Sequence, residues 1–354
     1  MNTQSMTAEA IELLKRMIEI PSVSRDETRV ADMLEAFFND KGFKTKRKGN
    51  NSWIVSDNFS ENKKTILLNA HIDTVKPAST WKHNPFAATI EDNKIIGLGS
   101  NDDGASIVSL FEAFSYLNKE EQNCNFIFLA SCEEEVSGRN GIESVLPELG
   151  KIDVALVGEP TGMQPAIAEK GLMVVDVTVR GKAGHAARNE GVNAIYKAMD
   201  DINWIRNHVF SKRSEILGDV KTTVTIINSG TQHNVIPDEC TYTIDVRSNE
   251  NYSNQEIFDI LKENLNGEPH ARSFRLNSSR ISKEHPLVKR AIALGRTELF
   301  GSPTLSDQAL MNFPSLKMGP GESSRSHTAE EFILVSEIEE AINIYIKMLD
   351  GIEL

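Results

Sequence analysis

Cysteine is scarce in this sequence, and its three residues, Cys124, Cys132 and Cys240, share no motif spacing. An odd number of isolated thiols suits a reducing compartment without structural disulfides, and it argues against metal ligation by thiolates. The first residues also lack the basic head and the apolar block of a signal peptide. We therefore expect a cytoplasmic protein.

Long apolar runs and an excess of basic residues are missing as well. Hydrophobic residues make up 40% of the chain, yet no apolar run approaches the ~20 residues that a membrane-spanning helix requires. The 38 Lys and Arg residues are outnumbered by 51 Asp and Glu, which gives a formal net charge of -13. Such a chain repels phosphate backbones, so we expect neither nucleic acid nor a membrane as its partner.

The first half of the chain alternates helical periodicity with short apolar runs. Residues 27–43 and 104–119 carry apolar side chains at helical spacing, whereas 64–70, 125–131 and 154–158 are almost continuously apolar. Runs of this kind are typical of strands that are buried on both faces. The pattern predicts an α/β fold in which helices flank a parallel or mixed sheet.

From about residue 167 the pattern changes. Residues 172–181, 221–230 and 240–248 alternate apolar with polar side chains, and helical segments near 190–210 and 253–265 interrupt them. The order β-α-β-β-α-β predicts a ferredoxin-like α+β unit.

After about residue 283 the first pattern returns, and a capping-box pattern at Ser336 indicates the start of a final helix. We therefore expect a catalytic domain formed by residues 1–166 and 283–354. A lid or dimerisation domain, residues 167–282, would be inserted into it.

Acidic residues and histidines follow the predicted strands of the first domain. His71 and Asp73 come two apart at the end of an apolar run, so their side chains should point the same way. Open α/β sheets bind their ligands at the carboxyl ends of strands. The loops within 97–106, 131–138, 157–162 and 319–331, each bounded by glycine or other small residues, should meet the His71 loop in one crevice.

These five loops supply two imidazoles and three carboxylates: His71, Asp102, Glu135, Glu159 and His327. Carboxylates crowd together in this way only where cations neutralise them. Nitrogen and oxygen ligands without sulfur suit zinc, with cobalt or manganese as substitutes. Five ligands with one bridging carboxylate give three contacts to each of two ions, so we expect two Zn²⁺. Glu134 is then free to act as the proton-transferring base.

These motifs resemble those of the di-zinc amidohydrolase family that includes acetylornithine deacetylase, succinyl-diaminopimelate desuccinylase, aminoacylases and carboxypeptidase G. HIDTV, GLGSNDD, EEEV, GEPT and SRSHTAEE occur in the family's order, and the resemblance covers nearly the whole chain. It implies that Asp102 bridges the two zinc ions, that Asp73 orients the His71 ring and that Glu134 is the general base. Gly104, where many members carry lysine, and Glu133, where aspartate is commoner, depart from the pattern.

The inserted domain resembles the family too. The resemblance implies that His185 reaches the active site of a partner subunit and helps to hold the transition-state oxyanion, so a homodimer is expected. It implies that Asn234 and Arg247 contact the substrate. Asp307 is left open between a structural role in its loop and a place in the substrate wall.

The GEPTGMQPAIAEKG segment most resembles acetylornithine deacetylase, which implies hydrolysis of N-acetylornithine in arginine biosynthesis. One alternative is an N-succinyl-amino-acid desuccinylase of ornithine, citrulline or diaminopimelate type. Its substrate would need another cation near the acyl group, such as Arg325 or Lys170. The others are a dipeptidase or carboxypeptidase, and a binding protein that keeps the fold without catalysis.

Overall fold

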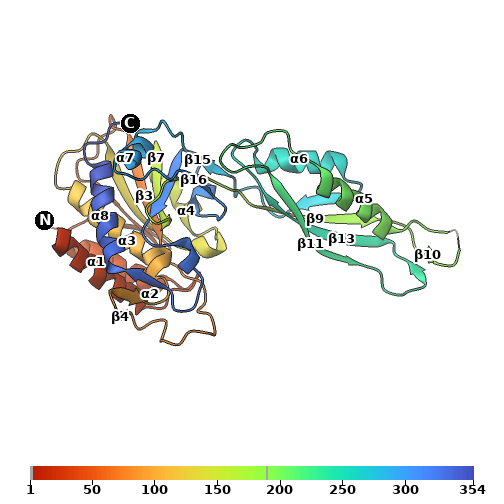
Figure 1. Cartoon of the computed structure of the whole chain (residues 1–354), viewed down its shortest axis with the longest axis horizontal. Helices are drawn as coiled ribbons and strands as arrows, with labels where there is room; N and C mark the ends of the chain where they lie inside the picture. The colour runs from red at the N-terminus through yellow and green to blue at the C-terminus, as the bar shows by residue number, and fades with distance from the viewer. Residues whose placement is uncertain (1–2, 189) are drawn as a thin grey trace. The chain divides into compact units, whose positions relative to one another are not determined.

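The computed structural model describes residues 3–188 and 190–354, which form two compact units (Figure 1). The first unit contains the residues up to Ile167 together with Arg280–Phe300 and Ser306–Leu354. The second contains Ala168–Ser279 and Gly301–Leu305. No helix among the described residues is long and apolar enough to span a membrane.

The first unit is built on a mixed sheet. Its helices are α1 (Thr3–Ile18), α2 (Thr28–Asp40), α3 (Ala105–Leu117), α4 (Ile142–Val145), α7 (Pro286–Ala293) and α8 (Val335–Leu349). Its strands are β1 (Lys46–Lys48), β2 (Asn51–Val55), β3 (Thr65–His71), β4 (Thr89–Glu91), β5 (Lys94–Ile96), β6 (Asn125–Ser131), β7 (Val154–Pro160), β17 (Ser315–Gly319) and β18 (Phe332–Leu334). Three short strands lie at the boundaries between the units: β8 (Ala166–Glu169), β15 (Ser279–Arg280) and β16 (Phe300–Ser302).

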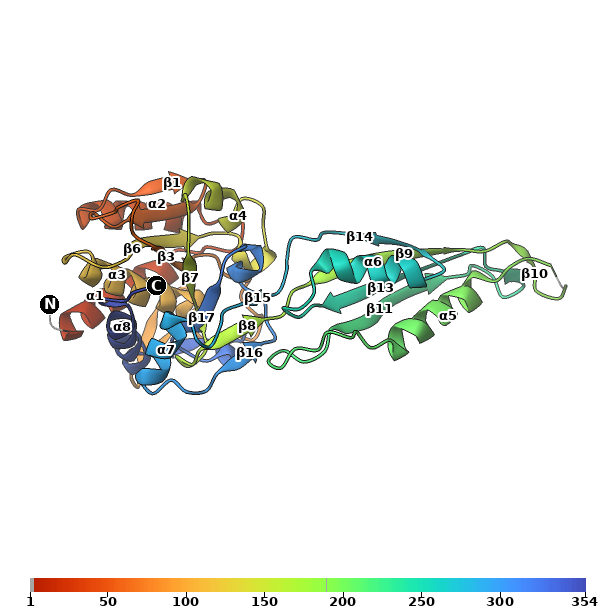
Figure 2. The same cartoon turned by 90° about the horizontal axis from the view of Figure 1, so that it is seen from above.

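In the described part of the chain, nine strands form the main sheet in the order β1-β2-β6-β3-β7-β17-β8-β15, with β16 paired to β8. Strands β6, β3, β7 and β17 are parallel and lie side by side (Figure 2). Strands β1 and β2 at one side and β8 at the other pair antiparallel with their neighbours. The mixed sheet with flanking helices that the sequence predicts is confirmed.

Both faces of this sheet are covered, which explains the apolar runs. Because strand side chains alternate, Ile66, Leu68 and Ala70 of β3 lie in the main core with helices α1, α3 and α8. Leu67, between them, lies in a smaller core with residues of α4. The carboxyl ends of the parallel strands thus stand on a rigid, doubly covered base.

The second unit is an antiparallel sheet with two helices. Its strands are β9 (Met173–Arg180), β10 (Gly184–His185), β11 (Lys221–Ser229), β12 (Val235–Ile236), β13 (Glu239–Arg247) and β14 (Glu268–Ala271), and its helices are α5 (Ala194–Asn207) and α6 (Asn254–Asn264). The sheet order is β11-β13-β9-β14, and β10 pairs with β12. The alternate residues Met173, Val175, Val177 and Val179 of β9 are buried in one core with residues of both helices.

The start of the last helix differs from the prediction. Helix α8 begins at Val335, directly after β18, so Ser336 lies inside the helix. The N–H of Leu334 donates to a carboxylate oxygen of Glu337 at 2.9 Å. The prediction of a capping box at Ser336 is wrong because the end of a strand, rather than a serine, determines where this helix begins.

Close packing explains why glycine stands at position 104. It ends a π-helical turn, Ser100–Gly104, and its N–H donates to the carbonyl of Gly99 at 2.9 Å. A Cβ at this position would lie 2.5 Å from that carbonyl oxygen and 2.7 Å from a methyl carbon of Leu14. Lysine therefore cannot replace Gly104 unless the turn that carries Asp102 moves.

Glu112 on α3 gives a test of the first unit's core. Its side chain is buried, and burial together with the nearby charge of Glu9 raises its pKa from 4.5 to about 8. Between these pH values the unfolded chain releases the proton that the folded chain keeps, so stability falls as pH rises, by up to about 1.4 kcal/mol per pH unit. Glu112→Gln removes this loss.

We expect Glu112→Gln to be more stable than the parent at pH 8 and nearly equal to it at pH 5. Urea unfolding of both proteins at the two pH values measures the difference, and other titrating groups cancel in the comparison. An equal difference in unfolding free energy at pH 5 and pH 8 would contradict this prediction.

Candidate metal centre

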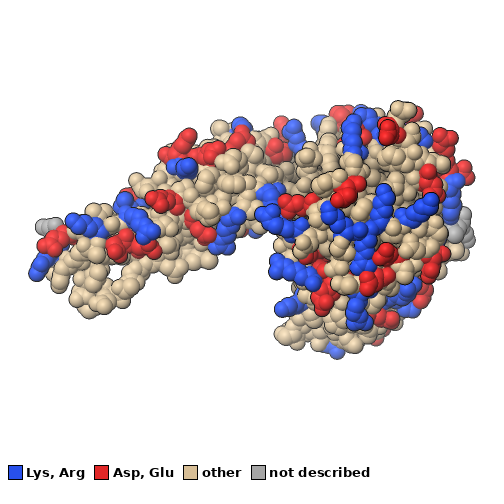
Figure 3. All heavy atoms as spheres, turned by 180° about the vertical axis from the view of Figure 1, so that it is seen from behind, with Lys and Arg blue, Asp and Glu red and all other residues tan. Residues whose placement is uncertain are grey.

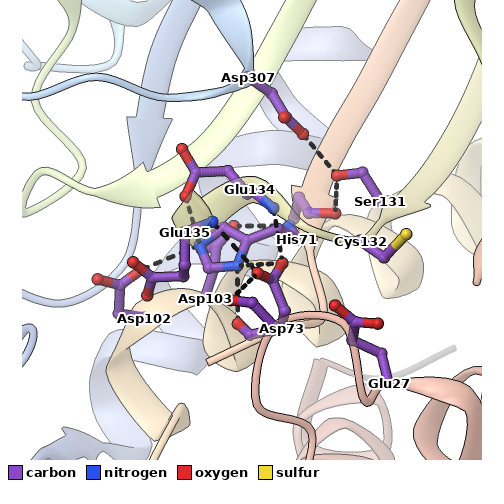
Figure 4. A network of polar contacts seen from close by, with 12 residues as sticks. Glu27, His71, Asp73, Asp102, Asp103, Ser131, Cys132, Glu134, Glu135 and Asp307 are labelled. Atoms are coloured by element: carbon purple, nitrogen blue, oxygen red, sulfur yellow. Dashed lines mark hydrogen bonds and ion pairs between the residues drawn. The ribbon is translucent and has the colours of Figure 1, made fainter. Parts of the chain in front are cut away.

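The ends of the parallel strands bring the predicted ligands together, and Figure 4 shows three of them, His71, Asp102 and Glu135. His71 is the last residue of β3, and Glu134 and Glu135 follow β6 in a 3-10 turn, Glu134–Val136. Glu159 lies near the end of β7, and the segment after β17 carries His327. Asp102 comes from the π-helical turn after β5. This is the edge at which parallel sheets place their ligands.

A chain of short contacts links four of the predicted ligands. His71 Nε2 lies 3.1 Å from Asp102 Oδ1, and His327 Nε2 lies 3.5 Å from Asp102 Oδ2. Asp102 is therefore between the two imidazoles. His327 Nε2 is also 2.9 Å from a carboxylate oxygen of Glu135.

Donor atoms gather in two groups that could each hold a metal ion. One combines His71, Asp102 and Glu135, and the other combines His71, Glu134 and Glu159, with all donor atoms of a group within 4.8 Å of one another. Glu134 also lies 3.9 Å from His71 Nε2. It thus stands beside the ligand set, at a distance from which it can reach a ligand or a water at the same centre.

Asp73 organises the loop that carries the two glutamates. Its fully buried carboxylate accepts hydrogen bonds from the backbone N–H groups of Glu134 at 2.9 Å and Glu135 at 3.2 Å, and from the Ser24 hydroxyl at 2.7 Å. His71 Nδ1 lies 2.9 Å from the Asp73 carbonyl oxygen and 3.5 Å from its carboxylate. The arrangement leaves His71 Nε2 facing the ligand cluster.

Crowded carboxylates dominate the electrostatics of the site. Burial alone would lower the pKa of His71, but hydrogen bonds to Asp102 and Asp73 outweigh it and raise the pKa well above 6.5. Burial raises the pKa of Glu134 far above its ordinary value, and the charge of Glu159 raises it further. Burial likewise raises the pKa of Asp103.

This donor set fits divalent cations. Two imidazoles and several carboxylates converge without sulfur, and the buried Asp103 Oδ1 makes no hydrogen bond of ordinary geometry within the described residues. Burial first, and the neighbouring acids second, raise the carboxylate pKa values, and bound cations would stabilise the ionised carboxylates.

Two acidic residues around the site, Asp103 and Glu331, were not among the predicted site residues, and a third, Asp307, was left open between a structural role and the substrate wall. Asp103 follows Asp102, and its Oδ2 accepts a hydrogen bond from the backbone N–H of His71 at 3.2 Å. Asp307 is buried and accepts from the Ser131 hydroxyl at 2.6 Å (Figure 4). Burial raises the pKa of Asp307 to about 6. Glu331 is 2% exposed, and burial followed by the charge of Asp102 raises its pKa to about 8.

The other predicted residues lie in the second unit. His185 and Asn234 are neighbours there, because the N–H of Ala186 donates to the Asn234 carbonyl at 3.0 Å. Both residues are exposed. Arg247 lies at the other end of the sheet, where it forms two hydrogen bonds with Asp245, at 2.8 and 3.1 Å.

The two proposed cations for a succinyl group are also engaged. Arg325, in the first unit, pairs with Glu337 through two hydrogen bonds, at 2.7 and 3.0 Å, and its guanidinium lies 4.5 Å from the centre of the Phe332 ring. Lys170, in the second unit, donates to the Asp219 carbonyl at 3.2 Å.

Comparison with known proteins agrees with this fold and site. Residues 67–351 match the model of the Peptidase family M20/M25/M40. The chain belongs to this family. The resemblance to metal-dependent amidohydrolases is thereby confirmed, and the chain is an amidohydrolase.

The relatives of this chain are named for different activities. A putative succinyl-diaminopimelate desuccinylase of Mycobacterium tuberculosis is 27% identical over 98% of this chain and 99% of its own. An acetylornithine deacetylase of Pectobacterium carotovorum is 26% identical over 91% of this chain and 92% of its own. Among solved structures, the dinuclear metal binding peptidase YXEP of Bacillus subtilis has the same fold, with a TM-score of 0.73, 16% identity and coverage of 99% of this chain and 100% of the other.

Proposed function

We propose that the chain uses two zinc ions to hydrolyse the N-acyl amide of a small amino acid, with N-acetylornithine as its substrate. The observation that carries the proposal is the convergence of His71, Asp102 and Glu135 at the strand ends, with Glu134 and Glu159 against the same imidazole. Cobalt or manganese would fit the same oxygen and nitrogen donors.

In this proposal His71, Asp102 and Glu159 hold one ion, and Asp102, Glu135 and His327 hold the other. The two metal ions, when bound, would acidify a water molecule and polarise the acyl carbonyl. Glu134 takes the proton from that water and then gives it to the leaving nitrogen. Asp73 supports both tasks, because it contacts His71 and holds the backbone of Glu134.

The environment of Arg325 favours an acetyl over a succinyl group. A succinyl substrate carries a second carboxylate, which needs a cation with unused donors. Arg325 already makes a two-point pair with Glu337 and is only 18% exposed at its side chain. The desuccinylase alternative nevertheless has an observation of its own, the 27% identity to the Mycobacterium tuberculosis protein.

The experiment is a comparison of kcat/KM for N-acetylornithine, N-succinylornithine, N-succinyl-diaminopimelate and a dipeptide, with zinc added to the purified protein. We expect N-acetylornithine to be preferred. Preference for either succinyl substrate would replace the acetyl assignment with the desuccinylase alternative. Hydrolysis of the dipeptide alone would replace both with a peptidase.

We also propose that two chains pair through the second unit and that His185 acts in the partner's site. Strand β11 is at the edge of its sheet, and Ile226 and Ile227 on it are about half exposed. Tyr196 and Met199 of α5 are 67% and 58% exposed. A strand with one free edge and apolar residues on a neighbouring helix favour two-fold pairing.

The placement of His185 and Arg247 within the second unit supports this assignment. Arg247 lies beside the start of β9, whereas His185 follows its end. Eight residues of extended strand separate them by roughly 25 Å. One small substrate cannot contact both residues of the same chain, so in this proposal each site takes Arg247 from one chain and His185 from the other.

Mixing two inactive variants tests this arrangement. If His185 acts in the partner's site, a heterodimer of Glu134→Gln and His185→Ala has one intact site. Subunit exchange at equal amounts should then restore roughly a quarter of the parent rate. Each variant alone is the control. A mixture that stays as inactive as its components, although heterodimers form, would show that His185 does not act across the interface.

A further inference from the structure

Glu331 sits where two segments of the metal centre are joined by a small sheet. Strand β18 pairs antiparallel with β5, and Phe332 is aligned with Ile96. The residue before β18 therefore faces the residue after β5, and the N–H of Gly97 donates to the carbonyl of Glu331 at 3.0 Å. This register places the Glu331 side chain beside the turn that carries Asp102.

The Glu331 carboxylate collects three backbone donors from that turn. One oxygen accepts the N–H groups of Asn101 and Asp102, each at 2.9 Å, and the other accepts the N–H of Gly99 at 3.2 Å. The carboxylate is almost entirely buried. The two carboxyl oxygens thus face three converging donors, whereas an amide at this position would turn an N–H toward one of them.

The same turn also forms hydrogen bonds with the segment that precedes His327. Asn101 Nδ2 donates to the carbonyl of Glu322 at 3.1 Å, and the N–H of Glu322 donates to Asn101 Oδ1 at 3.1 Å. The segment from Glu322 to Glu331 contains His327. Asp102 and His327 are thus held by one hydrogen-bonded frame, in which Glu331 supplies the carboxyl group.

We infer that Glu331 is a positioning residue, which fixes the Asp102 backbone so that the Asp102 carboxylate reaches both imidazoles at once. The inference rests on the proposed two-metal centre, and it adds a residue that neither contacts the substrate nor binds metal. Losing such an outer partner typically weakens metal affinity by about 10–100-fold.

The test compares Glu331→Gln and Glu331→Asp with the parent protein and with Glu112→Gln. Glu112 is the matched control, because it is another buried glutamate of the first unit, on α3, and it has no hydrogen bond to the ligand segments in the described structure. Calorimetric titration of metal-free protein with zinc measures affinity. Hydrogen exchange of peptides covering residues 97–104, followed by mass spectrometry without metal, measures how firmly the turn is held.

We expect Glu331→Gln to bind zinc about 10–100-fold more weakly than the parent, and its 97–104 amides to exchange at least about tenfold faster. Glu331→Asp, which keeps a carboxyl group on a shorter side chain, should lie between the two. Glu112→Gln should match the parent in zinc affinity, and its 97–104 amides should exchange no faster than those of the parent.

Parent-like zinc affinity and parent-like exchange in Glu331→Gln would overturn the inference. So would equal weakening in Glu112→Gln, since the effect would then belong to any buried glutamate. If the parent protein itself bound no zinc, the proposed metal centre would fail. Amide exchange in the metal-free proteins would still show whether Glu331 holds the turn.

Discussion

Glu134→Gln is expected to lower kcat by about 10²–10⁴-fold, because glutamine can neither accept the proton of the attacking water nor return it to the leaving nitrogen. The substitution keeps the size of the side chain and leaves intact the backbone N–H that Asp73 accepts. Metal content should therefore remain at the parent level. Steady-state kinetics with N-acetylornithine, together with metal analysis of the same sample, measure both quantities.

The neighbouring glutamate is the control for this variant. Glu133 is buried, and its carboxylate accepts from the backbone and the side chain of Asn140, at 3.3 and 2.8 Å. Glu133→Gln should change kcat by less than about tenfold. Loss of a general base costs more than this, about 10²-fold or more. A full rate in Glu134→Gln, or a larger loss in Glu133→Gln, would reassign the base.

Asp102→Ala is expected to have the second large effect, because its two carboxylate oxygens face different imidazoles, at 3.1 and 3.5 Å. Its removal takes a ligand from both proposed ions and should lower zinc affinity by more than the ~10–100-fold that outer partners cost. Activity at limiting zinc should be lost with it. Zinc titration and kinetics measure both effects. Asp307→Asn is the control, because Asp307 is another buried carboxylate but contacts Ser131.

Retention of two tightly bound ions in Asp102→Ala would show that this residue does not bridge. Loss of one ion only would indicate that it serves a single site. In either case the other four predicted ligands would have to be reassigned, since three contacts to each ion require a shared carboxylate.

Much of the first unit could be predicted because its sequence pattern has a simple physical cause. Strand β3 is buried on both faces, so its residues read as a continuous apolar run, and His71 breaks that run where the strand ends. The parallel neighbours β6, β7 and β17 end at the same edge. Loops that are distant in sequence therefore meet there, and the mixed sheet is confirmed.

The surrounding residues were harder to predict because their roles depend on backbone register. Glu331 is the second of two adjacent acids after His327, and such a pair is usually solvent-exposed. It reaches the Asp102 turn only because Phe332 is aligned with Ile96. The start of α8 has a similar origin, since β18 runs directly into it. Local capping signals do not report such long-range pairing.

The second unit shows the other limit of sequence reasoning. The alternation of β9 predicts a strand with one buried face, and the unit contains that strand in an antiparallel sheet. The roles of His185, Asn234 and Arg247 stay predictions, because they depend on where a substrate and a partner chain would lie.

Titration of metal-free protein with zinc, while hydrolysis of N-acetylornithine is followed, tests the two-metal centre. We expect two zinc equivalents per chain, with activity that is absent in the presence of a chelator and returns as zinc is restored. Hydrolysis that is insensitive to chelation, or a protein that binds no zinc at saturating concentration, would contradict this expectation.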